Sequence, residues 1–234
     1  MTRQSIPTFS IAFIAAAGTL KGPTVFRYLL KSPVIRVRDS LVVVDNVDVS
    51  KSWIPEYVAV AGTEDLSLSE ISDSLTMGSY DFLVTCGWNA RITERAIAAP
   101  KIAALNCHGS YLPDYRGMSA YLHYWANMEP SGGVTVHYLT ASLDQGDILT
   151  QSRFSIDRLA RPSTIAAQVA EMTGPLLIEA MLYASMGYGG QVQSSGRYFF
   201  QASRADLIRH RLWNEISNLS GLPKKLTGHR GAVN

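Results

Sequence analysis

Short apolar runs alternate with helical segments through about residue 140, and this alternation constrains the fold more than any other feature. Four of the runs have the length and composition of buried strands. They cover Ile11–Ala16, Leu41–Val44, Tyr80–Cys86 and Ile102–Asn106. Strands that alternate with helices usually assemble into one mostly parallel sheet with helices on both faces. We therefore expect an α/β fold built on a doubly wound, mostly parallel sheet.

The other segments complete this predicted architecture. Shorter helices are predicted over Pro23–Leu30, Leu66–Leu75, Thr93–Ala98 and Ala120–Asn127, and extended segments over Tyr57–Val60, Gly133–Leu139 and Gly146–Ile156. A long helix is predicted over Pro162–Met186, a β-hairpin or extended arm over Gln191–Gln201, and a last helix over Arg204–Leu219. We expect a main domain over residues 1–160 and a small C-terminal extension of helix, β-hairpin and helix over residues 161–234.

Composition limits the classes of function. The 234 residues are 47% hydrophobic and 17% charged, which is typical of a globular protein with a sizeable core. The net charge is −3 before residue 151 and +5 from there on, so that the C-terminal third is mildly basic. This charge could help to hold an anionic ligand, but it is too weak to indicate a nucleic-acid partner.

The cysteines and the N-terminal residues bear on the cellular compartment. Cys86 and Cys107 end predicted buried strands, so we expect reduced thiols, and their spacing does not resemble a zinc site. The apolar run Phe9–Ala17 faintly resembles a signal peptide, but the sheet needs a first strand there. No apolar stretch approaches the roughly 20 residues of a transmembrane helix. We expect a cytoplasmic protein without membrane contact.

Three side chains at one edge of the predicted sheet suggest chemistry. Asn106 and His108 leave one strand on alternate residues and therefore share a face, and Asp144 lies in a later loop. Glycines 18 and 87 also follow predicted strands, so these strand ends meet at one crevice. An amide donor, an imidazole and a carboxylate are the groups needed to move an acyl group between nitrogens.

Each of these residues also has an ordinary structural interpretation. His108 could be a buried structural histidine, and either Asp144 or Asp147 could cap a turn; we favour Asp144 as the functional carboxylate. His137 could simply pack in its strand, and Trp88 could belong to the core or to the wall of the crevice. The first loop, residues 17–22, lacks the glycine motifs of dinucleotide and triphosphate sites.

Three ordered blocks resemble one family. Residues 106–117 resemble the N-x-H-x-S-x-L-P-x-x-R-G block of the formyltransferases that use N10-formyltetrahydrofolate. Residues 133–137 and 143–148 are similar to the family blocks G-V-T-x-H and L-D-x-G-D-I. Two departures, Gly109 in place of proline and Gln145 in place of threonine, remove no functional group. The resemblance implies a Rossmann-like formyltransferase fold.

The resemblance also implies the roles of the site residues. Asn106, His108 and Asp144 would be catalytic: Asn106 as the oxyanion donor, His108 as acid, base or donor, and Asp144 as the group that orients or charges His108. The reduced folate would lie between residues 88–92 and 139–144, which makes Trp88, Ile92, Leu139 and Asp144 candidate co-substrate contacts. The co-substrate would be N10-formyltetrahydrofolate, and no metal is implied.

The acceptor is inferred mainly from what the chain lacks. Members that act on initiator tRNA are expected to carry a further basic C-terminal domain, deacylating relatives an N-terminal regulatory domain, and the purine-pathway enzyme a different first loop. We therefore expect a nucleotide-linked amino sugar, with dTDP-4-amino-4,6-dideoxyhexose as the best candidate. Arg116, Gly117 and His137 are candidate substrate contacts, and we expect a homodimer. The alternatives are phosphoribosylglycinamide formyltransferase and a non-catalytic folate or nucleotide-sugar binder.

Overall fold

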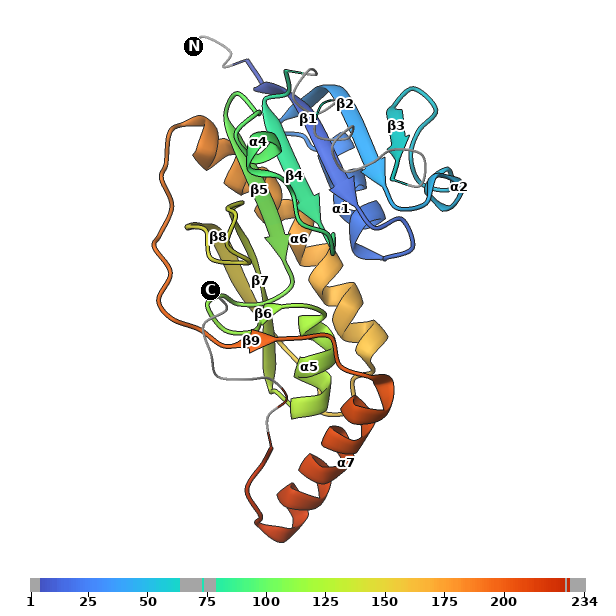
Figure 1. The fold of residues 1–234 in the computed structure, drawn as a ribbon, viewed down its shortest axis with the longest axis vertical. Coiled ribbons are helices and arrows are strands. Elements are labelled where there is room, and N and C mark those ends of the chain that lie inside the picture. Colours follow the sequence, from blue (N-terminus) through green and yellow to red (C-terminus); the bar gives the residue numbers. More distant parts are fainter. Residues whose placement is uncertain (1–4, 64–72, 74–78, 226, 228–234) are drawn as a thin grey trace.

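The chain folds around a seven-stranded sheet with the strand order β3-β2-β1-β4-β5-β7-β8 (Figure 1). The structure is a computed structural model that describes residues 5–63, 73, 79–225 and 227. The sheet strands are β1 (Thr8–Ala15), β2 (Arg36–Val44), β3 (Ala59–Gly62), β4 (Phe82–Cys86), β5 (Ala103–His108), β7 (Ser131–Tyr138) and β8 (Ile148–Ser155). Five neighbouring strands from β3 to β5 are parallel, and β7 and β8 continue the sheet antiparallel. The predicted mostly parallel α/β sheet is confirmed.

In addition to the sheet, the described residues form six helices. They are α1 (Lys21–Leu30), α2 (Val47–Ser50), α4 (Glu94–Ile97), α5 (Ala120–Asn127), α6 (Pro162–Ser185) and α7 (Arg204–Ser220). The helix predicted over residues 66–75 lies, apart from residue 73, outside the described part of the chain. The division predicted at residue 160 stays a prediction; α6, which follows it, packs against α1 and against strands β7 and β8.

Strand β1 shows why its sequence is a continuous apolar run. Ile11 and Phe13 point into the cluster that also contains Phe26 of α1, and Ile14 points into a second cluster with Leu83 of β4. Side chains of a strand alternate between the two faces of a sheet, and here both faces are covered. The run predicted to be the first strand is therefore buried on both faces.

Helix α6 is as long and as apolar as a membrane-spanning helix, which was not expected from the sequence. By length and composition alone its 24 residues could cross a membrane, with a mean hydropathy of 1.2 over the most apolar window. The helix instead lines the sheet, and Leu177 and Met181 are fully buried in the same core cluster as Phe13 (Figure 1). Its apolar composition is thus accounted for by the core of this fold.

Of the β-hairpin and the extended arm predicted over Gln191–Gln201, the structure has the extended arm. Among the described residues it forms two short pairings. Gln191 bridges Ile148, and β9 (Tyr198–Phe199) pairs in parallel with β6 (Arg116–Gly117). The residues between them are mostly polar, and the apolar Val192 is exposed, so they do not supply the apolar face that a hairpin buries. In Figure 1 this arm runs from the end of α6 past β8 to β9.

Candidate active site

The carboxyl end of β5 and the strands beside it bring the predicted catalytic residues together. Asn106 on β5 lies opposite His137 on antiparallel β7 and beside Thr85 on parallel β4. Asp144 comes from the loop between β7 and β8. The three residues predicted to act together, Asn106, His108 and Asp144, meet in one buried cluster.

Every polar atom of the Asn106 side chain makes a hydrogen bond. Its Oδ1 accepts a hydrogen bond of 2.8 Å from the Thr85 hydroxyl. Its Nδ2 lies 3.0 Å from Asp144 Oδ1 and 3.0 Å from His137 Nε2. Because His137 Nδ1 is 2.8 Å from the Tyr138 carbonyl and must donate to it, Nε2 of the neutral ring is the acceptor. Both amide hydrogens of Asn106 are therefore used inside the cluster.

His108 is oriented by a backbone group. Its Nε2 lies 2.8 Å from the Tyr115 carbonyl, to which it donates, and its Nδ1 faces Asp144 Oδ1 at 3.4 Å. Burial lowers the pKa of His108, and this effect outweighs the nearby Asp144 charge and the Tyr115 hydrogen bond, which raise it. The ring is thus neutral near pH 7, with the lone pair of Nδ1 on the side of the carboxylate.

Asp144 is ionised despite its burial. Burial alone would raise its pKa, but the charge of a protonated His108 and the hydrogen bond from the Gly117 amide hold the pKa well below its usual range. The Gly117 N–H donates to Oδ2 at 2.7 Å, and Asn106 Nδ2 donates to Oδ1. These two hydrogen bonds favour the carboxylate even beside a neutral His108.

The structure assigns different surroundings to the two aspartates that the sequence offered. Asp144 is 5% exposed and points into the cluster. Asp147 is half-buried, and its backbone carbonyl accepts a hydrogen bond of 3.0 Å from the Tyr138 N–H. The position of Asp144 agrees with its choice as the functional carboxylate.

Two residues have a larger part in the site than the sequence indicated. His137 is fully buried, and its Nε2 lies 3.7 Å from Asp144 Oδ1 as well as beside Asn106. Lys21, in the first turn of α1, donates from Nζ to the Cys107 carbonyl at 2.5 Å. The alternation of side chains along β7 could have placed His137 in the site. The contact between Lys21 and the Cys107 carbonyl depends on the tertiary fold and could not be read from the sequence.

The candidate folate contacts also come together. Trp88, Ile92 and Leu139 are partly buried and pack on the same apolar cluster. The indole Nε1 of Trp88 is buried and has no hydrogen-bond partner among the described residues. The assignment of this apolar wall to the reduced folate stays a prediction.

Arg116 and Gly117 form strand β6, which contacts Asp144 through the Gly117 N–H. Arg116 is 5% exposed, and its Nη2 donates to Gln193 Oε1 at 2.8 Å and to the Ser194 carbonyl at 2.9 Å. Its Nε has no partner, and no carboxylate of the described residues lies within 4.0 Å of the guanidinium. The Gly117 N–H is used by Asp144.

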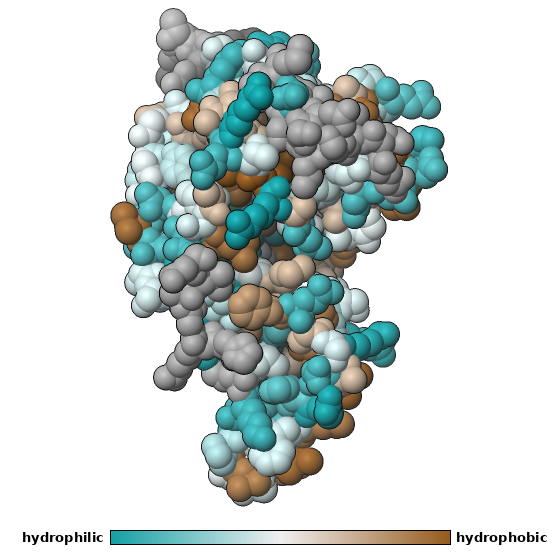
Figure 2. Space-filling view, viewed as in Figure 1, coloured by the Kyte–Doolittle hydropathy of each residue, from teal (hydrophilic) through white to brown (hydrophobic). Residues whose placement is uncertain are grey.

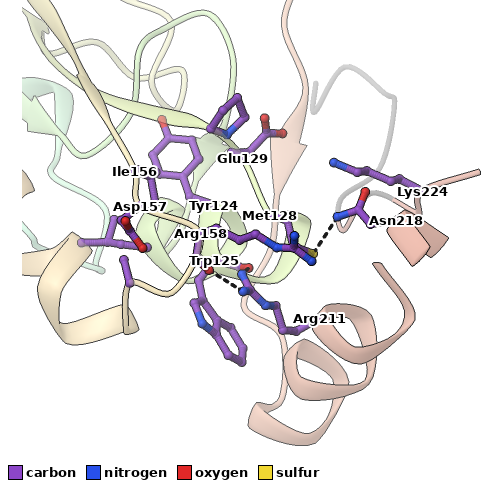
Figure 3. A pocket seen from close by; sticks show the side chains of 13 residues that line it. Tyr124, Trp125, Met128, Glu129, Ile156, Asp157, Arg158, Arg211, Asn218 and Lys224 are labelled. Atoms are coloured by element: carbon purple, nitrogen blue, oxygen red, sulfur yellow. Dashed lines mark hydrogen bonds between the residues drawn. The ribbon is translucent and has the colours of Figure 1, made fainter. Parts of the chain in front are cut away.

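A cavity of about 240 Å³ lies elsewhere, between α5, α7 and the segment after β8 (Figure 3). Tyr124, Trp125 and Arg158 belong to its lining, and Arg211 donates across it to the Trp125 carbonyl at 2.9 Å. The lining includes no member of the trio. The chemistry of the trio therefore does not take place in this cavity.

Comparison by sequence identifies relatives. A family model described as formyl transferase matches residues 41–181. A methionyl-tRNA formyltransferase of Staphylococcus aureus is 30% identical over 176 residues, which are 70% of this chain and 56% of the relative. One from Mycoplasmopsis pulmonis is 29% identical over 111 residues, which are 47% of this chain and 38% of the relative. The chain thus spans between 38% and 56% of the length of these relatives.

Solved structures share the fold at low identity. Glycinamide ribonucleotide transformylase 1 from Symbiobacterium toebii has a TM-score of 0.66 and 17% identity, covering 83% of this chain and 97% of its own. HypX from Aquifex aeolicus in complex with tetrahydrofolic acid has a TM-score of 0.64 and 15% identity, covering 85% and 30%. A Mycobacterium tuberculosis protein described as a candidate sugar N-formyltransferase has a TM-score of 0.63 and 15% identity, covering 86% and 85%.

Proposed function

Because the chain belongs to the formyl transferase family, we propose that it transfers a formyl group from N10-formyltetrahydrofolate to the amino group of a nucleotide-linked amino sugar. The observation that carries this proposal is the meeting of Asn106, His108 and Asp144 in one buried cluster. An amide donor, a neutral imidazole and a fixed carboxylate are the groups that formyl transfer to an amine requires.

Asn106 would stabilise the oxygen of the formyl group as it gains negative charge. Its amide hydrogens point at Asp144 and His137, so one of these hydrogen bonds must be exchanged for the substrate oxygen. The bond to the neutral His137 is the weaker of the two, since hydrogen bonds to charged groups are stronger. We assign the exchange to that bond.

His108 would accept the proton of the attacking amine at Nδ1. Its Nε2–H is fixed on the Tyr115 carbonyl, and Nδ1 is left unprotonated. The imidazolium formed would face Asp144 Oδ1, now 3.4 Å away, and the two charges would stabilise each other. Of the two roles left open for His108, this geometry favours the base.

Trp88, Ile92, Leu139 and Asp144 would hold the reduced folate, whose contribution is an activated formyl group on nitrogen. The unused Trp88 N–H and the apolar cluster beneath it support this assignment. The structural similarity to HypX with tetrahydrofolic acid supports it at the level of the fold. The proposal requires no metal.

Two cationic side chains near the trio support an anionic acceptor. Arg116 is buried without a carboxylate among its described neighbours, and Lys21 reaches the end of β5. The phosphates of a nucleotide-linked sugar, such as dTDP-4-amino-4,6-dideoxyhexose, would balance these charges. In this proposal Arg116 and Gly117 lie on the acceptor side, His137 supports Asn106, and the protein is a cytoplasmic homodimer.

A mass-spectrometric transfer assay tests the proposal. The protein is incubated with N10-formyltetrahydrofolate and, in parallel, with nucleotide-linked amino sugars, phosphoribosylglycinamide and initiator methionyl-tRNA. We expect a formyl group on an amino sugar. Transfer to either of the other two amines would replace the proposed acceptor, and folate binding without any transfer would support a non-catalytic binder.

A further inference from the structure

The extended arm after α6, residues 190–199, touches the loop that carries Asp144. Within the arm, Gln193 is half-buried and uses both ends of its side-chain amide. Nε2 donates to the Gly146 carbonyl at 2.6 Å and to the Asp144 carbonyl at 3.2 Å. Oε1 accepts from Arg116 Nη2 at 2.8 Å. The arginine can only donate, so the orientation of this amide is fixed.

The loop that Gln193 binds is one that needs support. Asp144 has a φ of 51°, a left-handed conformation that is unfavourable for a residue with a side chain. Leu143, just before it, is 53% exposed and contributes little packing. Gly146 passes so close to the Tyr138 carbonyl that any side chain there would collide with it. The backbone at Asp144 is therefore held by hydrogen bonds more than by a core.

The same arm reaches the Asp144 carboxylate by a second route. Phe199 of β9 pairs with Gly117 of β6, and the Gly117 N–H donates to Asp144 Oδ2 at 2.7 Å. The arm thus fixes Asp144 through its backbone, by way of Gln193, and through its side chain, by way of Gly117. None of the arm residues belongs to the trio.

We propose that Gln193 is a positioning residue for formyl transfer, because it holds the Asp144 loop at the distance and angle that His108 requires. This inference rests on the proposed function.

Two substitutions separate the two ends of the Gln193 amide. Gln193→Met keeps the size of the side chain and removes all its hydrogen bonds. Gln193→Glu keeps an acceptor for Arg116 but loses the donor to the two carbonyls. Gln201→Met is the matched control, since Gln201 is exposed and lies just beyond the arm. Steady-state kinetics are measured per folded molecule.

We expect both Gln193 variants to lower kcat roughly 10- to 100-fold, as small displacements of catalytic groups do, with the acceptor KM within about twofold. Gln201→Met should match the wild type. If Gln193→Glu keeps full activity, Gln193 serves Arg116 and not the loop, and the inference is overturned. Equal losses in Gln193→Met and Gln201→Met would overturn it as well.

An NMR titration of His108 in the ligand-free protein gives a second readout that does not depend on turnover. His108 is faced by Asp144 from its loop, His137 from β7 and Lys21 from α1. Burial lowers its pKa, and the Lys21 charge lowers it further, whereas Asp144 raises it. If Gln193 holds Asp144 in place, its loss should shift the His108 titration to lower pH.

This titration distinguishes failure of the inference from failure of the proposed function. If the wild type transfers no formyl group to any acceptor, the proposed function fails, and the titration still decides the role of Gln193. An unchanged His108 titration in both Gln193 variants would contradict the positioning role. Should Gln193→Met fail to fold, Gln193→Glu carries the same comparison.

Discussion

Asn106 is the residue through which the trio is joined, because its side chain binds Thr85, His137 and Asp144 at once. Loss of the amide would therefore remove the proposed oxyanion donor and leave Asp144 without one of its two hydrogen bonds.

We predict that Asn106→Ala lowers kcat by about 10²–10³, the usual effect of removing one oxyanion donor. The control is Thr85→Val, which removes the hydrogen bond that orients the amide, together with the hydroxyl's longer contact to the Leu105 carbonyl, and should have a smaller effect. Formyl-transfer kinetics of the two variants check this. A rate for Asn106→Ala within tenfold of the wild type would exclude the assigned role.

The pH dependence of formyl transfer should reflect the lowered pKa of the buried His108. Burial lowers the pKa of His108 below its ordinary value of about 6.5. A base must be unprotonated, so activity is lost only as the pH falls through this lowered pKa. We predict that kcat/KM is constant near neutrality and that the midpoint of its acid limb lies below pH ~6.5. A midpoint above 7 would contradict a base with a lowered pKa.

At the scale of elements, the short pairing of β6 with β9 ties the arm to the site. Gly117 has a φ of 98°, and a side chain there would collide with the Phe199 carbonyl. Strain of this kind typically amounts to ~1–3 kcal/mol. The short strand therefore depends on glycine at this position.

Gly117→Ala should lower the free energy of unfolding by about 2 kcal/mol or more and should also reduce formyl transfer. Gly189→Ala is the matched control in the segment just before the arm, because a side chain there meets nothing within 4 Å. Chemical denaturation of both variants measures the difference. Equal stability of the two would show that β6 tolerates a side chain.

The loop after β4 offers an optical test of the folate site. Trp88 lies in the apolar cluster with Ile92 and Leu139, and its N–H is unused. We predict that tetrahydrofolate quenches tryptophan fluorescence and that Trp88→Phe removes most of the quenching and raises the Kd several-fold. Trp213→Phe, on distant α7, is the control. Unchanged quenching in Trp88→Phe would place the folate elsewhere.

For the whole molecule, the sheet and the trio could be predicted from the sequence, because both depend on local patterns. The apolar runs mark the strands, and the two-residue spacing of Asn106 and His108 places them on one face of β5. The sequence left the segment after α6 as a hairpin or an extended arm, and it could not predict what the arm contacts. Its hydrogen bonds from Gln193 and its pairing through Tyr198 and Phe199 join residues about 50 to 80 positions apart.

The aromatic residues of the C-terminal extension show the same limit. Among them are Tyr198, Phe199, Phe200 and Trp213, and their spacing in the sequence does not say what they pack against. Tyr198 and Phe199 are buried, and Phe199 stacks on Tyr115 at 4.1 Å, so this pair belongs to a core. Helix α7 still exposes Ile208, Leu212 and Ile216, and apolar atoms are visible over it in Figure 2. The homodimer stays a prediction.

The most direct test of the central claim is formyl transfer by the wild type and by the double variant Asn106→Ala/His108→Ala, measured side by side with N10-formyltetrahydrofolate and the best acceptor amine. Circular dichroism and thermal unfolding confirm that both proteins are folded. We predict turnover by the wild type and no detectable turnover by the double variant. A folded double variant that still transfers the formyl group would contradict the account, because the chemistry would then lie outside the Asn106, His108 and Asp144 cluster.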